Sequence, residues 1–277
     1  MPQKIWFITG ASSGFGRGLA KAVLDRGDKV LLTARNPSSL DDLVAAYPGN
    51  ALAAALDVTK TDEVRAAVEA AVSAFGGIDV LANVAGYGLI GAVEECTPEE
   101  YRPLFEANLF GLIEVTRAAL PSLRERKGRI VQFSSTLGML GRAGFGLYSA
   151  AKFAVEGLSE ALAAEVEPLG LHVIIVEPGA FRTDFLDRSI AVAEQSIDAY
   201  AETAGAVRAG ALANNGHQGG DPAKGVAVIL QAVDAETPPL RLALGLDSYR
   251  NNRSKIARAT GDYDAWAALG TATSFDA

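Results

Sequence analysis

The stretch "FITGASSGFG", residues 7–16, fits two different functional patterns. Gly10 to Gly14 match G-x-S-x-G, the turn that presents a nucleophilic serine, here Ser12, in α/β hydrolases. Gly10, Gly14 and Gly16 also form a glycine-rich turn of the kind that lets the phosphates of a dinucleotide approach the backbone. The position of this stretch within the fold decides between the two patterns.

Short apolar segments alternate with longer helical patterns along the chain. The first six apolar segments lack polar alternation, as expected for strands that are covered on both faces. Strands are predicted at 4–9, 29–33, 51–56, 80–83, 129–133, 171–176 and 240–244, and helices at 16–25, 39–46, 61–75, 98–126, 149–168 and from about 222. This alternation predicts an α/β fold, with residues 1–277 forming a single Rossmann-type domain around a doubly wound parallel sheet.

One long irregular segment, residues 182–221, separates the sixth strand from the helix near Pro222. Long segments of this kind in a compact domain are more often functional than idle. We therefore expect residues 182–221 to be an insertion that covers the substrate.

Composition narrows the classes of function. The 277 residues carry a formal net charge of −8 without a run of Lys and Arg, which argues against nucleic-acid binding. Two histidines and one cysteine, Cys96, make a metal site and a disulfide improbable. Neither a signal-peptide pattern nor an apolar stretch of about 20 residues is present. These features predict a soluble, cytoplasmic protein without membrane contact.

The glycine turn follows the first predicted strand and opens the first predicted helix. In a parallel sheet ligands bind beyond the carboxyl ends of the strands, and backbone N–H groups at a helix start attract a pyrophosphate. The serine turn of a hydrolase normally follows several strands, whereas one strand precedes Ser12. Only His172 and His217 could serve as its base. The position of the turn favours a dinucleotide site over a serine esterase.

The end of the second strand indicates which dinucleotide is bound. Residues 33–36, Thr-Ala-Arg-Asn, lack the acidic residue that would bond a free ribose 2′-hydroxyl. Arg35 could instead face a 2′-phosphate with its planar, multi-donor head, although a solvated loop arginine is the alternative. NADP(H) is therefore expected in preference to NAD(H).

Tyr148 and Lys152 lie four residues apart at the start of a predicted helix, so both side chains share one helix face. A neighbouring ammonium favours the phenolate and lowers the pKa of a tyrosine, which can then exchange a proton with a carbonyl or an alcohol. The pair follows the fifth strand, whose carboxyl end carries Ser134 and Ser135. These groups are expected at one ligand-binding edge of the sheet.

Taken together, these motifs resemble the short-chain dehydrogenase/reductase family over most of residues 4–185. The matching pieces are "TGASSGFG", "LDV" at 56–58, "NVAG" at 83–86, Asn108, Ser135, Tyr148 with Lys152, and "PGAFRT" at 178–183. One departure is Val84, where the family usually has a second asparagine after Asn83. This difference affects local tuning only.

The resemblance implies four catalytic residues. Tyr148 is the general acid in reduction and the base in oxidation, and Lys152 lowers the pKa of that tyrosine and holds the nicotinamide ribose. Ser135 bonds the substrate oxygen, and Asn108 anchors a water-linked proton relay to Lys152. By themselves, Ser135 could instead cap the next segment and Asn108 could be a polar residue inside a helix.

The resemblance also implies a cofactor-binding set. In it, Asp57 and Val58 contact the adenine, although Asp57 could instead form a turn at a strand end. The full set is Gly10, Ser12, Ser13, Gly14, Phe15, Gly16, Arg35, Asp57, Val58, Asn83, Ala85, Gly86, Tyr148, Lys152, Pro178, Gly179, Phe181 and Thr183.

Apolar residues flank the chemical groups and suggest a hydrophobic ketone or secondary alcohol as substrate. They are Leu89, Ile90, Leu137, Met139, Leu140, Phe145, Phe181, Phe185 and Leu186. Family members usually form dimers or tetramers through the helices that correspond to 98–126 and 149–168. A regulatory protein that binds NADP(H) without turnover is the alternative, but binding alone needs no proton donor.

Overall fold

The computed structural model describes residues 2–275 and contains the expected doubly wound parallel sheet. Every neighbouring pair of strands in this seven-stranded sheet is parallel. In spatial order the strands are β3 (Ala51–Ala55), β2 (Lys29–Ala34), β1 (Ile5–Ile8), β4 (Val80–Asn83), β6 (Arg129–Phe133), β7 (His172–Pro178) and β9 (Arg241–Leu244). The order reverses between β1 and β4, and this switch point is where such sheets bind ligands.

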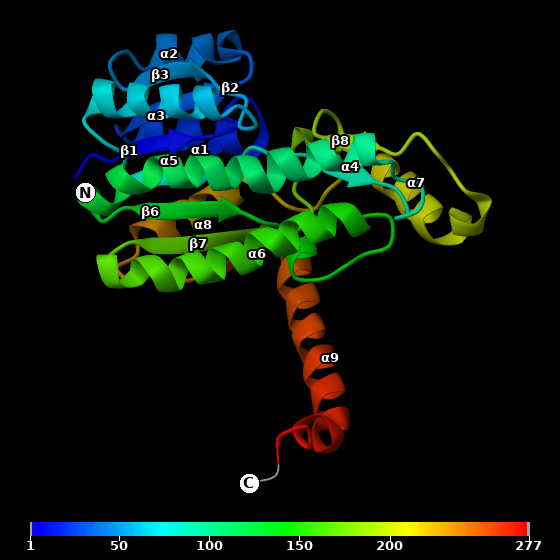
Figure 1. Ribbon diagram of the computed structural model, residues 1–277. Coiled ribbons are helices and arrows are strands. Elements are labelled where there is room, and N and C mark those ends of the chain that lie inside the picture. The colour runs from blue at the N-terminus through cyan, green and yellow to red at the C-terminus, as the bar shows by residue number, and fades with distance from the viewer. Residues whose placement is uncertain (1, 276–277) are drawn as a thin grey trace.

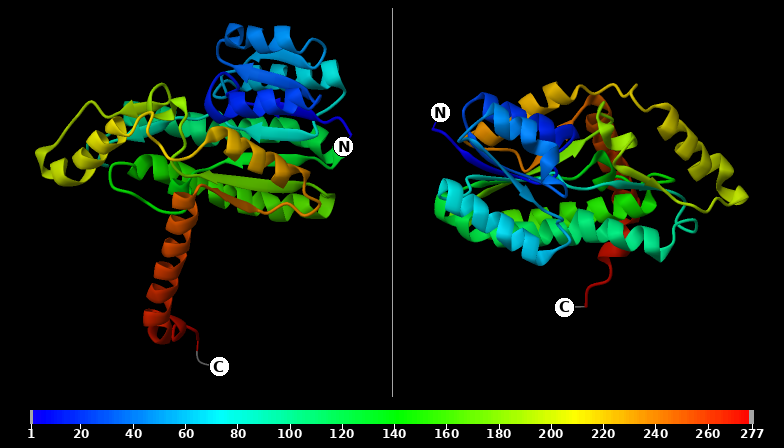
Figure 2. Two further views of the ribbon diagram at one scale, coloured as in Figure 1. Left: turned by 180° about the vertical axis from the view of Figure 1, so that it is seen from behind. Right: turned by 90° about the horizontal axis from the view of Figure 1, so that it is seen from above.

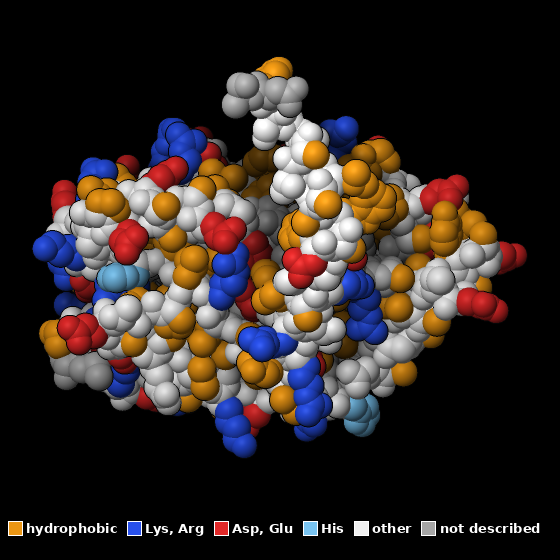
Figure 3. All heavy atoms as spheres, turned by 90° about the horizontal axis from the view of Figure 1, so that it is seen from below, with side chains coloured by type: hydrophobic (Ala, Val, Ile, Leu, Met, Phe, Trp, Pro, Cys, Tyr) orange, Lys and Arg blue, Asp and Glu red, His pale blue; other side chains and the backbone are white. Residues whose placement is uncertain are grey.

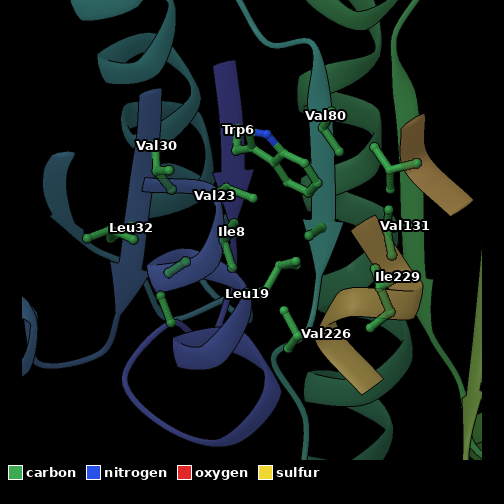
Figure 4. Close-up of a cluster of buried hydrophobic side chains, with 14 of the residues drawn as sticks. Trp6, Ile8, Leu19, Val23, Val30, Leu32, Val80, Val131, Val226 and Ile229 are labelled. Carbon is green, nitrogen blue, oxygen red and sulfur yellow. The ribbon is translucent and has the colours of Figure 1, made fainter. Parts of the chain in front are cut away.

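Helices cover both faces of the sheet (Figures 1 and 2). Successive residues of a strand point to opposite faces, so Trp6 and Ile8 pack with α1 and α8 while Phe7 packs with α3, α5 and α6. Figure 4 shows the first of these clusters, with Ile8 near Leu19. The helices that flank the sheet are α1 (Gly14–Asp25), α2 (Asp41–Ala46), α3 (Thr61–Phe75), α5 (Gly111–Arg126), α6 (Gly146–Val166) and α8 (Pro222–Asp234).

The helix expected at 98–126 is present, but it is not uniform. It consists of α4 (Pro98–Phe105), a π-helical turn at Glu106–Phe110, and α5. Its start carries a reciprocal capping box between Thr97 and Glu100, with Pro98 at the first helical position. The wider π turn contains Asn108, and turns of this kind are frequent at functional sites.

The segment 182–221 is more ordered than its sequence suggests. It contains β8 (Ile190–Val192), which pairs in parallel with β5 (Gly88–Ile90), and α7 (Ala206–Ala213). The buried carboxylate of Glu95 holds it to the body with both oxygens, because Oε1 accepts a hydrogen bond from Ile197 N at 2.9 Å and Oε2 forms an ion pair with Arg208 at 3.2 Å. The expectation of an irregular segment was wrong in this respect.

Helix α9 (Leu246–Thr271) follows the last strand and was not predicted. Its first turns are anchored, since Ser248 and Asn252 are buried. The rest extends away from the body, as Figure 1 shows from the side and Figure 3 from below. None of the helices within residues 2–275 combines the length and the apolar character needed to cross a bilayer.

Candidate active site

The glycine turn connects β1 to α1 at the ligand-binding edge of the sheet. Gly10 and Gly14 have φ of +66° and +51°, which side chains rarely adopt. A Cβ on Gly10 would lie 3.0 Å from the Cα of Ala85, and one on Gly16 would overlap the carbonyl of Gly10. The turn therefore keeps bare backbone at the start of α1, where amide groups can hold a phosphate.

The loop after β4 is fastened to this turn by Thr9. The hydroxyl of Thr9 accepts hydrogen bonds from the backbone N–H groups of Val84 at 2.9 Å and Ala85 at 3.0 Å. Val84 contributes through its backbone in these contacts, which explains why a valine is accommodated there.

One cavity of about 1170 Å³ connects the glycine turn with the predicted chemical residues. It is lined by 18 of the predicted site residues, and Gly16 and Asn83 are the two that do not line it. The lining includes Gly10, Ser12, Ser13, Gly14, Phe15, Arg35, Asp57, Val58, Ala85, Gly86, Asn108, Ser135, Tyr148, Lys152, Pro178, Gly179, Phe181 and Thr183.

Asn83 and Gly16 have other roles. The Asn83 amide donates hydrogen bonds to Thr116 and Gln132, both at 2.9 Å, and so lies in a buried polar network beneath the sheet. Gly16 allows α1 to pack closely on the turn. Of the predicted apolar substrate residues, Leu89, Ile90 and Met139 do not line the cavity, and the first two are buried in the core around β5.

Tyr148 and Lys152 lie on the inner face of α6, and both are buried. The Lys152 Nζ donates a hydrogen bond to the carbonyl of Phe133 at 2.8 Å and lies 5.9 Å from the centre of the Tyr148 ring. Phe145 and Phe185 pack against the same ring. The phenol is therefore enclosed by aromatic side chains at the inner end of the cavity.

Asn108 and Ser135 complete this group. Asn108 exchanges two hydrogen bonds with the backbone of Tyr87, donating to its carbonyl at 2.8 Å and accepting from its N–H at 3.0 Å. A Cβ on Gly86 would overlap Asn108 Oδ1 and lie 3.6 Å from Lys152 Nζ, so the three residues meet closely. Ser135 caps the turn at Thr136–Gly138, accepting from Leu137 N at 3.1 Å, and lines the cavity together with Tyr148.

The protonation of the pair differs from the expectation. Burial raises the pKa of Tyr148 to about 12, opposed by the effect of the Ser135 hydroxyl. Burial also lowers the pKa of Lys152 to about 8, opposed by the charge of Glu156. A lowered tyrosine pKa was expected from the adjacent ammonium, but desolvation of the buried phenol dominates and raises the pKa instead. The phenol of Tyr148 is therefore protonated at neutral pH.

Arg35 and Asp57 lie at the opposite end of the cavity. Arg35 is exposed at the carboxyl end of β2, and no ion pair engages it within residues 2–275. The Asp57 carboxylate accepts from Thr59 N at 3.0 Å and from its hydroxyl at 2.8 Å, so it forms the turn considered as an alternative. Asp57 nevertheless lines the cavity.

The sequence did not reveal contributions from α9. Asp247 and Asn251 line the cavity, and the Asp247 carboxylate accepts a hydrogen bond from Ala180 N at 2.7 Å. A Cβ on Gly179 would overlap this carboxylate, which accounts for the glycine. The signal available was the run of polar residues directly after the last strand, at the edge of the sheet where ligands bind.

Chemistry based on Ser12 or on a metal finds little support in residues 2–275. Neither His172 nor His217 lines the cavity that contains Ser12. No group of His, Cys, Asp and Glu side chains there is suited to hold a metal ion. A dinucleotide turn joined to a phenol, an ammonium and two polar positioning groups is instead typical of an enzyme that exchanges hydride and proton.

Comparison with known proteins agrees with this class. The family model for short chain dehydrogenases matches residues 4–192, and the chain belongs to this family of oxidoreductases. It is 38% identical over 263 residues to Oxidoreductase BOA17 of Botryotinia fuckeliana, covering 94% of this chain and 96% of that protein. It is 39% identical over 248 residues to a 3-ketodihydrosphingosine reductase of Bacteroides thetaiotaomicron, covering 88% and 89%.

A solved structure gives the same result. The crystal structure of a short-chain dehydrogenase from Streptomyces avermitilis superposes with a TM-score of 0.92 at 45% identity, covering 99% of this chain and all of that one.

Proposed function

We propose that the protein is an NADP(H)-preferring oxidoreductase that interconverts a ketone and a secondary alcohol of mostly apolar character. The observation that carries this proposal is the convergence of Asn108, Ser135, Tyr148 and Lys152 on the cavity that begins at the glycine turn. The bare backbone at Gly10 and Gly14 fits the pyrophosphate of a dinucleotide. When bound, the nicotinamide supplies or accepts the hydride.

The protein residues provide the proton and the orientation. Tyr148, protonated at neutral pH, gives its phenolic proton to the carbonyl oxygen of the substrate in reduction. Ser135 donates a hydrogen bond to the same oxygen and stabilises the charge that develops there. Lys152 holds the nicotinamide ribose and, with Asn108, returns a proton to the phenol.

The decisive experiment compares wild type, Tyr148→Phe and Tyr101→Phe in NADPH oxidation with a panel of ketones. Loss of a general acid costs about 10²- to 10⁴-fold, so Tyr148→Phe should lower kcat by at least about 100-fold while the dissociation constant for NADPH changes little. Tyr101 is partly buried beside the same aromatic cluster but does not line the cavity, which makes it the matched control. Full activity of Tyr148→Phe would refute the assignment.

The preference for NADP(H) is proposed from Arg35. Its exposed guanidinium at the end of β2 is free to bond a 2′-phosphate, and no carboxylate occupies positions 33–36. Hydrogen bonds to charged groups contribute about 1.5–3 kcal/mol, so Arg35→Ala should lower the ratio of kcat/KM for NADPH to that for NADH by about 10- to 100-fold. Arg65→Ala on α3 is the surface control. An unchanged ratio in Arg35→Ala would remove this arginine from cofactor selection.

The apolar walls near Tyr148 support an apolar substrate. Besides Leu137, Leu140, Phe145, Phe185 and Leu186, the lining includes Ile190, Val207 and Ala211 from the segment 182–221. This segment is the proposed substrate cover. The activity named for the Bacteroides relative, reduction of a 3-ketodihydrosphingosine, is consistent with a ketone that has an apolar body.

Two further features of the proposal concern assembly and location. Phe110, in the π-helical turn between α4 and α5, is 49% exposed, and Phe153 on α6 is 42% exposed. These are the helices that we expect to join subunits in a dimer or tetramer. The single cysteine suits a cytoplasmic location. The regulatory alternative, binding of NADP(H) without turnover, is disfavoured by the buried proton donor.

A further inference from the structure

A cluster of charged side chains, two of them buried carboxylates, lies next to the part of α6 that carries Lys152. Its members are Glu156 on α6, Glu177 on β7 and Arg241 on β9. Glu156 is 4% exposed and Glu177 is 1% exposed, which is rare for carboxylates. No residue of this cluster lines the cavity, and the reaction proposed above does not use them.

Arg241 forms ion pairs with both buried carboxylates, Glu156 and Glu177. Its Nε lies 3.3 Å from Glu156 Oε2 and 3.4 Å from Glu177 Oε1, and its Nη2 lies 3.0 Å from Glu160 on the surface. Within residues 2–275, neither oxygen of Glu156 accepts a well-formed hydrogen bond. A buried carboxylate so placed depends on neighbouring charges for its stability.

The cluster is held against the catalytic segment by α9. Asn252 donates a hydrogen bond to Glu177 Oε2, and its carbonyl oxygen accepts one from Thr136 at 3.3 Å. The Ser248 hydroxyl donates to the Glu177 backbone carbonyl at 2.7 Å. Thr136 is the neighbour of Ser135, so the same contacts fix the cluster and the segment that carries the substrate-binding serine.

Glu156 is the member of this cluster nearest to the chemistry along the chain. Tyr148, Lys152 and Glu156 follow one another at intervals of four residues, so they share one face of α6. Gly138 packs against this face, since a Cβ there would lie 3.1 Å from the Lys152 carbonyl and 3.2 Å from Glu156 Cγ. This close packing excludes a bulky group between Glu156 and the catalytic turn of the helix.

The charged groups that face Glu156 are Lys152 and Glu160 on its own helix, Glu177 on β7 and Arg241 on β9. Ser134 is its neutral polar neighbour, and Asn252 bonds the adjoining Glu177. Arg241 contacts both buried carboxylates, and Lys152 is the next cation near Glu156, one helical turn away along α6. Burial lowers the pKa of Lys152, and the negative charge of Glu156 opposes that effect.

We propose that Glu156 is a positioning residue whose carboxylate, anchored by Arg241, keeps Lys152 in its charged form. This inference rests on the proposed function for its effect on turnover, because a charged Lys152 is what holds the ribose and supplies the proton to Tyr148. Glu156 acts through Lys152 and touches neither substrate nor cofactor.

The experiment compares Glu156→Gln with Glu160→Gln, which removes the exposed carboxylate on the same arginine. Titration of Lys152 by NMR of ¹³Cε-labelled lysine should show its midpoint moved down by about one pH unit in Glu156→Gln, the effect of losing a nearby opposite charge. The alkaline limb of kcat/KM for reduction should move by the same amount. Glu160→Gln should leave both within about 0.2 units and its activity within about twofold, because exposed pairs interact weakly.

Wild-type protein supplies a test that does not depend on the folding of a variant. If Glu156 sets the charge of Lys152, the lysine resonance must respond in the pH range in which ¹³C-labelled Glu156 itself titrates. The inference is overturned if the Lys152 resonance does not change over the pH range in which Glu156 titrates. It is also overturned if the titration midpoint of Lys152 is unchanged in folded Glu156→Gln. If the wild type reduces no ketone but Lys152 still responds to the titration of Glu156, the proposed function is rejected. The inference that Glu156 keeps Lys152 charged then still holds.

Discussion

Gly86 lies at the point where the loop after β4 meets Asn108 and Lys152, two of the proposed catalytic residues. A side chain there would overlap Asn108 Oδ1 and approach Lys152 Nζ. The Asn108 side chain in turn makes two hydrogen bonds to the backbone of Tyr87, so a displacement at Gly86 moves both Asn108 and the wall of the cavity. The site therefore requires glycine at position 86, because there is no room for a Cβ.

Gly86→Ala should lower kcat/KM by at least about 100-fold, because misplacing a positioning group by about 1 Å has an effect of that size. Unfolding free energy should fall by about 1–3 kcal/mol through overpacking. The matched control is Gly157→Ala on the exposed side of α6, where a Cβ meets nothing within 4 Å. It should stabilise the protein by about 0.5–1 kcal/mol and leave activity unaltered. Steady-state kinetics and chemical denaturation measure both; equal activities of the two variants would contradict the requirement at Gly86.

The sequence predicted which residues share the cavity better than it predicted their electrostatics. Residue types and spacing indicated Tyr148 and Lys152, and the structure places them together on one cavity. The direction of the Tyr148 pKa could not be predicted, because it depends on how completely Phe145 and Phe185 exclude water from the phenol. That enclosure comes from segments about 40 residues apart in the chain.

Elements with a strong apolar pattern were predicted, and those defined by contacts were not. All seven strands of the sheet were found from the sequence, and the first six stand out because buried strands carry apolar runs without polar alternation. Strands β5 and β8 have three residues each and exist through pairing with one another across 100 positions. Their short length gives no periodic signal, so only the folded chain reveals them.

The π-helical turn at Glu106–Phe110 has a similar explanation. The sequence from Pro98 to Arg126 has the capping and apolar spacing of one long helix, which is what was predicted. A π turn keeps helical backbone angles and differs mainly in which carbonyl each N–H reaches, so propensities do not indicate it. Its position coincides with the bonds between Asn108 and Tyr87, which orient the amide toward Gly86 and Lys152.

At the scale of the molecule, the last strand and the last helix connect the edge of the sheet to the site. Arg241 on β9 pairs with buried carboxylates of α6 and β7, and α9 covers them through Ser248 and Asn252. The same helix lines the cavity with Asp247 and Asn251. The C-terminal part of the chain therefore contributes both to the stability of the sheet edge and to the shape of the site.

This arrangement makes stability depend on pH through Glu177. Burial, reinforced by the charge of Glu156, raises the pKa of Glu177 to about 7 from its ordinary 4.5. Between these values the folded protein holds a proton that the unfolded chain has released, so the stability contributed by this group is complete below pH 4.5 and is lost as pH rises through 7. The shift corresponds to a loss of about 3 kcal/mol.

Glu177→Gln should remove this dependence, because a neutral amide keeps an oxygen that can accept from Asn252 and cannot ionise. The unfolding free energy of wild type minus that of the variant should fall by about 3 kcal/mol between pH 4.5 and pH 8, while groups common to both proteins cancel. Glu165→Gln, an exposed carboxylate on α6, should show no such trend. Urea denaturation at several pH values measures the difference. Parallel pH profiles for wild type and Glu177→Gln would mean that Glu177 is ionised throughout this range, with Arg241 and Asn252 compensating its burial fully.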